Sequence, residues 1–337
     1  MVVLELTDNT INLRRCKKNV MSKFISSYLL PVTCYLLLTT CYLLLVSCNT
    51  STKTSEIPNT PTSGELKVFC EDGMFLHIRN QAYTFERIYY NSKINVKYVN
   101  EKQAIEGLYN DSCKVIIISR ILSNDEVKKF NAKNIYPTQI CIAKSAIAFV
   151  VPVNSTDSVI SIDKIKSIIS GEDTKYNMVF DNDNSGTTRF LKDSLLKGKT
   201  FGKNCFALKN TKELINHIST AKNTIGVLDF AWLSDADDST SKAFLSEVKI
   251  LAVSGNEFKI QNSKFKIAYM PDQSNIKTGD YPLCRWVYAT RRSADFTLGT
   301  GFSLFVAGQK GQIMFTKQGL IPFVQPNREV EVNTNPL

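Results

Sequence analysis

The sequence predicts an α/β protein of two lobes, each a mainly parallel sheet flanked by helices. Strand-like and helix-like segments alternate between residues 65 and 323, the order that parallel sheets require. Residues 115–118 (VIII) are apolar at every position, as in a strand buried on both faces. Ligands bind at the carboxyl ends of such strands, so we expect a ligand cleft between the lobes.

The N-terminal region indicates export. Residues 24–46 form an almost uncharged apolar run, and basic residues precede it. The residues before Cys48 are Leu-Val-Ser, and this ending looks like a bacterial lipobox, whose cysteine is lipidated and becomes the new N-terminus. A membrane-spanning helix is the alternative, and Met21 is an alternative start. We expect a signal peptide over residues 1–48 and a flexible linker, rich in Ser, Thr, Pro and Asn, over 49–64.

The first lobe begins with a β-α-β-α-β-α order. Strands are predicted at 67–70, at 94–98, where apolar residues alternate, and at 115–118, which is apolar throughout. Helices are predicted at 74–90, where apolar residues recur at three- and four-residue steps, and at 101–110. Ser123 with Glu126 three residues later is a capping box, which predicts the start of a third helix. We expect residues 65–149 and 283–337 to form lobe 1.

The second lobe is expected over residues 150–282. Strands are predicted at 146–151, 178–180, 224–228 and 248–253, and helices at 161–170 and 187–196. Residues 271–282 are interpreted as a loop, and 283–290 as a strand that returns to lobe 1. Residues 301–317 are predicted to form two short helices broken near Gly308.

The segment at residues 180–189 (FDNDNSGTTR) is the main candidate site. An apolar strand leads through a polar loop to Ser185, Gly186 and Thr187 at a helix start. The free N–H groups of a first helical turn carry partial positive charge and bind oxyanions. The hydroxyls would add donors, and the glycine permits close approach. An ordinary N-cap is the alternative interpretation.

Composition argues against several other functions. The chain has 41 Lys and Arg against 31 Asp and Glu, but no basic block with interleaved aromatic residues, so we expect no nucleic-acid partner. Only two histidines, no C-x-x-C and no G-x-S-x-G are present, so no metal site, cofactor or catalytic nucleophile is predicted and the chain is not expected to be an enzyme. Five of nine cysteines lie beyond the leader, and one disulfide of unknown pairing is possible in an exported protein.

Several segments together resemble a known family. They are the Ser-Gly-Thr helix start at 185–187, residues 162–171 (IDKIKSIISG), 225–230 (IGVLDF), 281–283 (YPL), and 311–312 (GQ) with 319–322 (GLIP). This pattern is similar to the phosphate-binding, PstS-like branch of the type II periplasmic solute-binding proteins of ABC importers. The resemblance covers nearly all of residues 65–323.

The resemblance implies that phosphate is held between the lobes by three elements. The first loop would contribute Asp72, Gly73 and Met74, within the segment 71–75 (EDGMF). Ser119 and Arg120 would follow the buried strand, and Ser185, Gly186 and Thr187 would close the site from the other lobe. The hinge is expected near residues 149–152 and 281–285.

The chain also departs from the family pattern. That pattern has an aspartate after the buried strand, which accepts the proton of hydrogen phosphate, and an arginine four residues before Ser-Gly-Thr. Here Arg120 stands near the first place and Asp181 at the second. Arg120 and Arg189 are therefore predicted to supply the missing bidentate cation, with Arg285 as a further candidate.

The resemblance implies a monomeric lipoprotein, anchored to a membrane through Cys48 and facing the periplasm, that captures phosphate and delivers it to an ABC permease. No Walker motif occurs in the chain, so the ATPase would be another polypeptide. Sulfate, another oxyanion or a phosphorylated small molecule is the alternative ligand, and a lipid-anchored sensory or adhesion module is the alternative role.

Overall fold

The computed structural model describes residues 58–255 and 267–325, the backbone of short strands at 258–260 and 263–265, and two isolated positions, 35 and 38. The described residues from 58 to 325 belong to one compact unit. The expected signal peptide and Cys48 lie outside the described residues, apart from those two positions. No helix among the described residues is both long and apolar enough to cross a bilayer.

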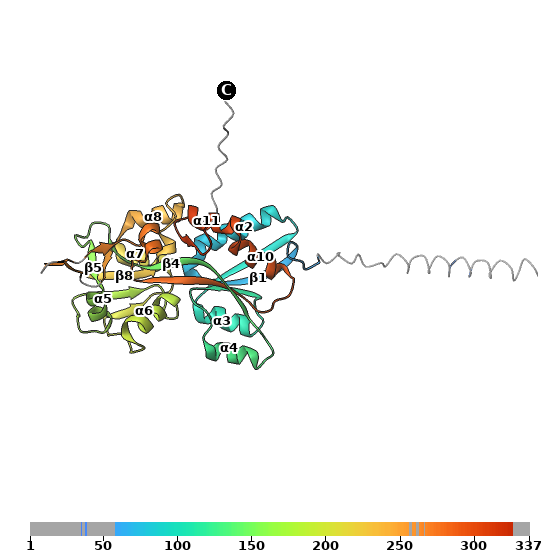
Figure 1. The fold of residues 1–337 in the computed structure, drawn as a ribbon, viewed down its shortest axis with the longest axis horizontal. Coiled ribbons are helices and arrows are strands. Elements are labelled where there is room, and N and C mark those ends of the chain that lie inside the picture. Colours follow the sequence, from blue (N-terminus) through green and yellow to red (C-terminus); the bar gives the residue numbers. More distant parts are fainter. Residues whose placement is uncertain are drawn as a thin grey trace, which may run out of the picture. The chain divides into compact units, whose positions relative to one another are not determined.

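One ten-stranded sheet organises the compact unit, in the order β2-β1-β3-β14-β4-β8-β6-β7, with β15 and β9 beside β4 (Figure 1). Its first part is parallel: β1 (Gly64–Glu71) lies between β2 (Ser92–Val99) and β3 (Val115–Ile118). Its last part is also parallel, where β6 (Asn177–Phe180) lies between β8 (Thr224–Asp229) and β7 (Cys205–Ala207). This confirms the predicted α/β class with mainly parallel strands in each part.

Two long antiparallel strands join the parallel parts. Residues 138–146 of β4 (Thr138–Pro152) pair with β14 (Cys284–Arg291) except at Ile142, where the register shifts, and its later residues pair with β8 and with β9 (Val248–Ile250). The predicted strand at 146–151 is thus only the second half of a strand of 15 residues. The start of the expected hinge segment at 281–285 lies beside Ala146 and Ile147, just before the other expected hinge segment at 149–152, and Tyr281 donates its hydroxyl to the Ile147 carbonyl at 2.5 Å.

Helices cover both faces of the sheet (Figure 1). One face carries α2 (Phe75–Ile88), α7 (Thr211–Thr220), α8 (Ser239–Glu247), α10 (Leu298–Ala307) and α11 (Gln309–Lys317). The other face carries α3 (Glu101–Tyr109), α4 (Asn124–Asn131), α5 (Ile162–Ile169) and α6 (Gly186–Leu196). The break at Gly308 and the Ser123–Glu126 capping box are confirmed.

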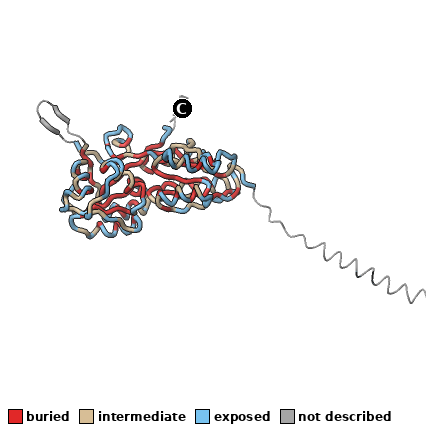
Figure 2. The backbone as a smooth tube through the Cα atoms, turned by 90° about the horizontal axis from the view of Figure 1, so that it is seen from below, coloured by how far each residue is buried: buried red, intermediate tan, exposed pale blue. Residues whose placement is uncertain are grey.

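The core follows from the apolar pattern of the strands. In Figure 2 the buried segments, in red, run through the interior of the compact unit, and the exposed segments, in pale blue, lie at its surface. In β3, Val115 and Ile117 belong to the main hydrophobic cluster, whereas Ile116 and Ile118 pack with Leu108 and Phe130 under α3 and α4. The continuous apolar run therefore does report a strand buried on both faces.

Three expectations about elements need correction. Residues 248–253 form two strands, because β9 pairs with β4 while β10 (Ala252–Ser254) pairs with β5 (Val159–Ser161) in a separate sheet that includes β13 (Ala268–Tyr269). The predicted loop at 271–282 contains α9 (Gln273–Thr278), capped by Asp272. Finally, residues 58–63, the last of the expected linker, are not a free linker, because they make specific contacts with the compact unit.

This attachment of residues 58–63 involves α10. The Asn59 side chain accepts the Leu298 N–H at 3.0 Å, and Thr60 and Ser63 form a bridge before β1 begins at Gly64. The Pro61 carbonyl packs so closely on Gly301 that a Cβ there would lie 1.7 Å from its oxygen. The start of the compact unit is therefore at residue 58 or before it, and not at 65.

The remaining described elements are short. They comprise the 3-10 helices η1 (Asp72–Met74) and η2 (Phe230–Trp232), the hairpin of β11 (Phe258–Ile260) with β12 (Ser263–Phe265), and β15 (Ile321–Pro322). Among them, η1 and η2 matter most for function, because each directly follows the carboxyl end of a parallel strand of the main sheet.

Candidate functional site

The carboxyl ends of four parallel strands converge at the middle of the sheet. Glu71 ends β1, Ser119 follows β3, Asp181 follows β6, and Asp229 ends β8. All four are buried. Because the two parallel parts of the sheet belong to different halves of the fold, these residues face one another across the cleft that the sequence predicts.

The start of α6 has the geometry expected for an anion site. Ser185 is the N-cap, and its Oγ accepts the Thr188 N–H at 3.2 Å and donates to Asp181 Oδ1 at 2.9 Å. Gly186 begins the helix, one residue before the predicted start. Its N–H points out of the helix end and donates to Glu71 Oε1 at 3.0 Å.

Glu71 receives hydrogen bonds as an oxyanion would. Besides the Gly186 N–H, its carboxylate accepts the Ser119 N–H at 2.9 Å and the Ser119 hydroxyl. The guanidinium of Arg285 lies 3.6 Å from Oε1. Both carboxylate oxygens of a side chain from β1 are therefore held by donors from Ser119, directly after β3, and from the start of α6, and a cation from β14 lies nearby.

Arg285 is the buried cation of the site, with 4 % of its surface exposed. Its Nη2 donates to Asp229 Oδ2 at 2.5 Å and to Thr187 Oγ1 at 3.0 Å. Asp229 also accepts the Ser145 hydroxyl at 2.5 Å and the Ala231 N–H at 2.8 Å. The Nε and Nη1 groups of Arg285 are buried and have no hydrogen-bond partner among the described residues.

The pKa values of two buried carboxyl groups, Asp181 and Glu71, move upward. Burial raises the pKa of Asp181 to about 7, against the hydrogen bond from Ser185. Burial also raises the pKa of Glu71; Arg285 opposes this shift, and the neighbouring carboxylates Glu101 and Asp229 add to it. For Arg285, burial alone would lower the pKa, but the charges of Glu71 and Asp229 raise it. The guanidinium is therefore a permanent charge.

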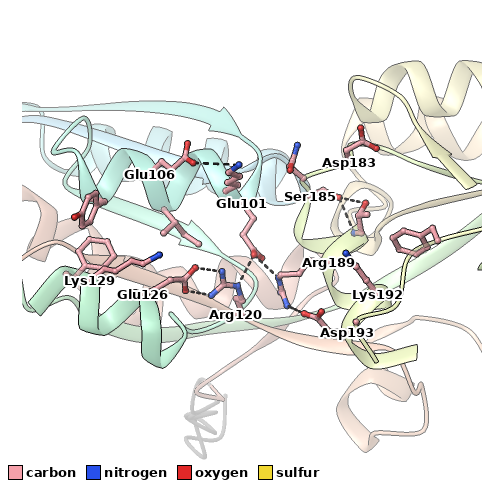
Figure 3. Close-up of a pocket in the computed structure, with 18 residues that line it drawn as sticks. Glu101, Glu106, Arg120, Glu126, Lys129, Asp183, Ser185, Arg189, Lys192 and Asp193 are labelled. Atoms are coloured by element: carbon pink, nitrogen blue, oxygen red, sulfur yellow. Dashed lines mark hydrogen bonds and ion pairs between the residues drawn. The ribbon is translucent and has the colours of Figure 1, made fainter. Parts of the chain in front are cut away.

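An open cleft of about 860 Å³ adjoins this inner site and is lined by residues of α3, α4 and α6 (Figure 3). Glu101 lies between two arginines, and its Oε1 accepts from Arg120 Nε at 2.8 Å and from Arg189 Nε at 2.7 Å. Arg120 also makes a bidentate pair with Glu126, at 2.7 and 2.8 Å. Arg189 reaches Asp193 at 3.2 Å.

The structure brings some predicted residues together and separates others. Ser119, Ser185, Gly186 and Thr187 all lie at the inner site. Arg120 and Arg189 lie in the outer cleft, where both make ion pairs with carboxylates, and their role as the ligand's bidentate cation stays a prediction. Arg285, considered only as a further candidate, is the arginine of the inner site.

The first loop differs from the expectation as well. Asp72 and Gly73 lie in η1, where Asp72 accepts the Thr211 hydroxyl at 3.3 Å and Gly73 packs on the Asp229 side chain. Met74 is fully buried in the main core. The side chain from this segment that contacts Ser119 and the start of α6 is Glu71, at the position just before these three residues.

Sequence reasoning missed Glu71, Glu101 and Asp229 as members of the site. An acidic residue directly after an apolar strand was a usable signal for Glu71 and Asp229, because strand ends of a parallel sheet meet at one edge. No local signal indicated Glu101, which begins an ordinary capped helix. Its Oε2 is buried and has no partner among the described residues.

Within the described part of the chain, no cluster of three or more His, Cys, Asp or Glu is arranged to hold a metal ion. The five cysteines of the compact unit, which include Cys70 beside Glu71, are free thiols in this structure. No disulfide joins any of them.

Comparison with solved structures finds phosphate-binding proteins of similar fold, whereas a search of curated proteins gives no match. The chain resembles a Clostridium perfringens structure assigned as a phosphate ABC transporter substrate-binding protein with bound phosphate, at 16 % identity and a TM-score of 0.63, over 77 % of this chain and 100 % of that one. An ABC-type phosphate transport receptor from Vibrio cholerae is similar at 14 % identity and a TM-score of 0.56, over 77 % and 100 % of the two chains.

These likenesses establish the fold. The model of a PBP superfamily domain matches residues 57–310, which is most of the compact unit and more than half of the chain. With its two-part α/β sheet and a cleft between the parts, the chain belongs to the PBP superfamily of periplasmic binding proteins.

Proposed function

We propose that the chain captures phosphate, or a related oxyanion, between its two halves and delivers it to the permease of an ABC importer. The observation that carries this proposal is the position of the Glu71 carboxylate. A helix N-terminus, a backbone N–H, a hydroxyl and a buried arginine surround a carboxylate there. The same donors suit a phosphate oxygen.

The comparisons support this ligand class. The structure from Clostridium perfringens contains bound phosphate, and the one from Vibrio cholerae is described as a phosphate transport receptor. Membership of the PBP superfamily supports a solute-binding role for the present chain rather than an enzymatic one.

The proposed cellular setting rests on the N-terminal sequence. The apolar run at 24–46 and the Leu-Val-Ser-Cys ending favour a lipoprotein that is anchored through Cys48 and faces the periplasm as a monomer. Ligand binding would favour the closed form, because an anion that contacts both halves stabilises that form over the open one. The closed form would then dock on the permease.

The outer cleft favours a second candidate ligand. Its volume of about 860 Å³ is much larger than a phosphate ion needs. Besides charged side chains, the cleft is lined by the apolar and aromatic side chains of Ile105, Tyr109, Phe130 and Phe201. A phosphorylated small molecule could place its phosphate at the inner site and its organic part in this cleft.

Calorimetric titration tests both candidates. The purified chain is stripped of ligand by partial unfolding and refolding, and titrated with phosphate, sulfate and a sugar phosphate. Arg285→Gln should weaken binding of the preferred anion by about thirtyfold or more, because it removes the buried cation. Thr187→Val should weaken it less, and Arg87→Gln, an exposed arginine outside the cleft, should leave it unchanged.

The outcomes separate the candidates clearly. A preference for phosphate over the sugar phosphate supports the first ligand, and the reverse preference supports the second. Absence of binding for all three anions, in protein that melts cooperatively, would refute the proposed ligand class.

A further inference from the structure

The inner site already holds an anion that belongs to the chain itself. Glu71 is 2 % exposed, and its two oxygens take up the Gly186 N–H, the Ser119 N–H and the Ser119 hydroxyl. These are the donors that the proposed function assigns to phosphate. Glu71 and a free oxyanion therefore cannot both use them.

Glu71 also connects the two halves of the fold. It ends β1 in the first parallel part of the sheet, whereas Gly186 begins α6, which packs on the second part. Its hydrogen bond to Gly186 N–H is thus a contact across the cleft. This is the kind of bridge that a bound ligand makes in a closed binding protein.

Electrostatics prevent a free anion from entering beside Glu71. The charged groups that act on the Glu71 carboxylate are Arg285 on β14 and the carboxylates Glu101 on α3 and Asp229 on β8. Asp72 on η1 and Asp181 after β6 line a small cavity with Glu71, together with Tyr98 and Lys209. An additional anion would be repelled by these carboxylates unless the Glu71 side chain moved away or lost its charge.

Arg285 has unused binding capacity. Its Nε and Nη1 have no partner among the described residues, and the Glu71 oxygen is 3.6 Å from Nη2, beyond hydrogen-bond distance. A carboxylate fixed to β1 reaches the helix start and Ser119 but does not satisfy the arginine. A free phosphate has four oxygens and no link to the backbone, so it could accept from the helix start and Ser119 and from Arg285 at the same time.

We infer that Glu71 is an internal ligand: its carboxylate occupies the oxyanion site, closes the cleft without solute, and must be displaced before an external oxyanion binds. This inference rests on the proposed function for the identity of the competing anion. The internal carboxylate makes the site selective. Only an anion that binds these donors more favourably than Glu71 does, by also contacting Arg285, can replace it.

Hydrogen exchange measured by mass spectrometry tests the closure, with no added anion. In the Glu71→Ala chain, peptides that contain the start of α6 (residues 181–190) and the end of β3 (115–122) should exchange faster than in wild type, because Gly186 and Ser119 lose their acceptor. Glu65→Ala is the matched control, since Glu65 is an exposed glutamate on the same strand. Unchanged exchange in Glu71→Ala would overturn the inference.

Titration with phosphate tests the displacement. Removing an internal competitor should tighten phosphate binding by about tenfold or more, and phosphate should restore slow exchange in the two peptides. Weaker binding by Glu71→Ala would overturn the inference, because it would show that Glu71 accepts a proton of the ligand instead of competing with it. Glu71→Gln, which keeps the side-chain volume and one acceptor oxygen but removes the charge, serves if the alanine variant does not fold, and it should also tighten phosphate binding.

The two hypotheses fail in different ways. If exchange rises in Glu71→Ala but phosphate neither binds nor slows it in any variant, the internal ligand stands and the phosphate assignment is wrong. If phosphate binds wild type and Glu71→Ala equally and exchange is unchanged, the phosphate assignment stands and the internal ligand is wrong.

Discussion

Asp181 connects the pH of the surroundings to the stability of the fold. Its carboxyl is buried, and burial raises its pKa from 3.8 to about 7. A raised pKa in the folded state means that the folded protein binds the proton of Asp181 more tightly than the unfolded chain does. The contribution to stability is complete below about pH 4 and is lost as the pH rises through 7.

Asp181→Asn should therefore remove this part of the pH dependence. The variant keeps an oxygen to accept from Ser185 but cannot ionise. At pH 8 it should be more stable than wild type by roughly 1–4 kcal/mol, and near pH 4 the difference should disappear. Urea unfolding at a series of pH values measures it. Equal pH profiles for the two proteins would show that Asp181 does not titrate in this range.

At the residue scale, sequence alone identified the polar groups of α6 but not the arginine that they meet. Ser185, Gly186 and Thr187 are recognisable because a helix start has a local signature. Arg285 lies about a hundred residues later and shares no local pattern with them. Arg120 and Arg189, nearer in sequence to predicted site residues, have carboxylate partners that only the three-dimensional structure reveals.

At the scale of elements, the start of α6 depends on close packing at Gly186. A Cβ there would lie 2.4 Å from Glu71 Oε1 and 2.8 Å from both Glu101 Oε2 and Ser119 Oγ. Gly186→Ala should destabilise the fold by about 1–3 kcal/mol, as measured by chemical unfolding. Gly255→Ala, where none of the described residues outside its chain neighbours lies within 4 Å of the added atom, is the control.

A double variant checks the cause of this effect. When Glu71→Ala is already present, the closest contact of the new methyl group is gone, so Gly186→Ala should cost clearly less. Additive effects of the two substitutions would instead place the clash elsewhere.

Helix α10 depends on a residue from the beginning of the compact unit. Its N-cap, Thr297, makes no side-chain capping bond, and Asn59 accepts the Leu298 N–H instead. Asn59→Ala should lower the free energy of unfolding by about 1 kcal/mol, whereas Asn59→Asp, which keeps the acceptor at a helix N-terminus, should not. Thermal unfolding of the three proteins provides the comparison, and equal loss in both variants would contradict a capping role.

Local periodicity predicted most helices and strands, and it failed where pairing partners decide the structure. Residues 248–253 read as one apolar strand, but β9 and β10 join different sheets. Likewise, the first half of β4 contains polar residues such as Lys144 and Ser145 that interrupt the apolar pattern. Its extent follows from pairing with β14, which is distant in sequence.

At the scale of the whole compact unit, β4 makes the two halves interdependent. One end of this strand pairs with β14 and β15, and the other end pairs with β8 and β9. The main hydrophobic cluster likewise includes buried residues of both parallel parts of the sheet. Neither half can unfold without exposing the strand that the other half needs.

We therefore predict one cooperative unfolding transition for both halves. The chain has two tryptophans, Trp232 on η2 after β8 and Trp286 on β14, so Trp232→Phe and Trp286→Phe each leave one fluorescent reporter. The two reporters should give the same urea midpoint after correction for the stability change that each substitution causes. Separate midpoints would show that the halves unfold independently.

The five buried or half-buried thiols of the compact unit have a consequence for its chemistry outside the cytoplasm. Burial raises the pKa of each of them, to about 11 for Cys141, Cys205 and Cys284. Because only the thiolate attacks disulfides and oxidants, such groups react slowly at neutral pH. The folded chain should therefore keep an odd number of cysteines reduced in an oxidising compartment, without needing an oxidase to mature or a reductase to repair it.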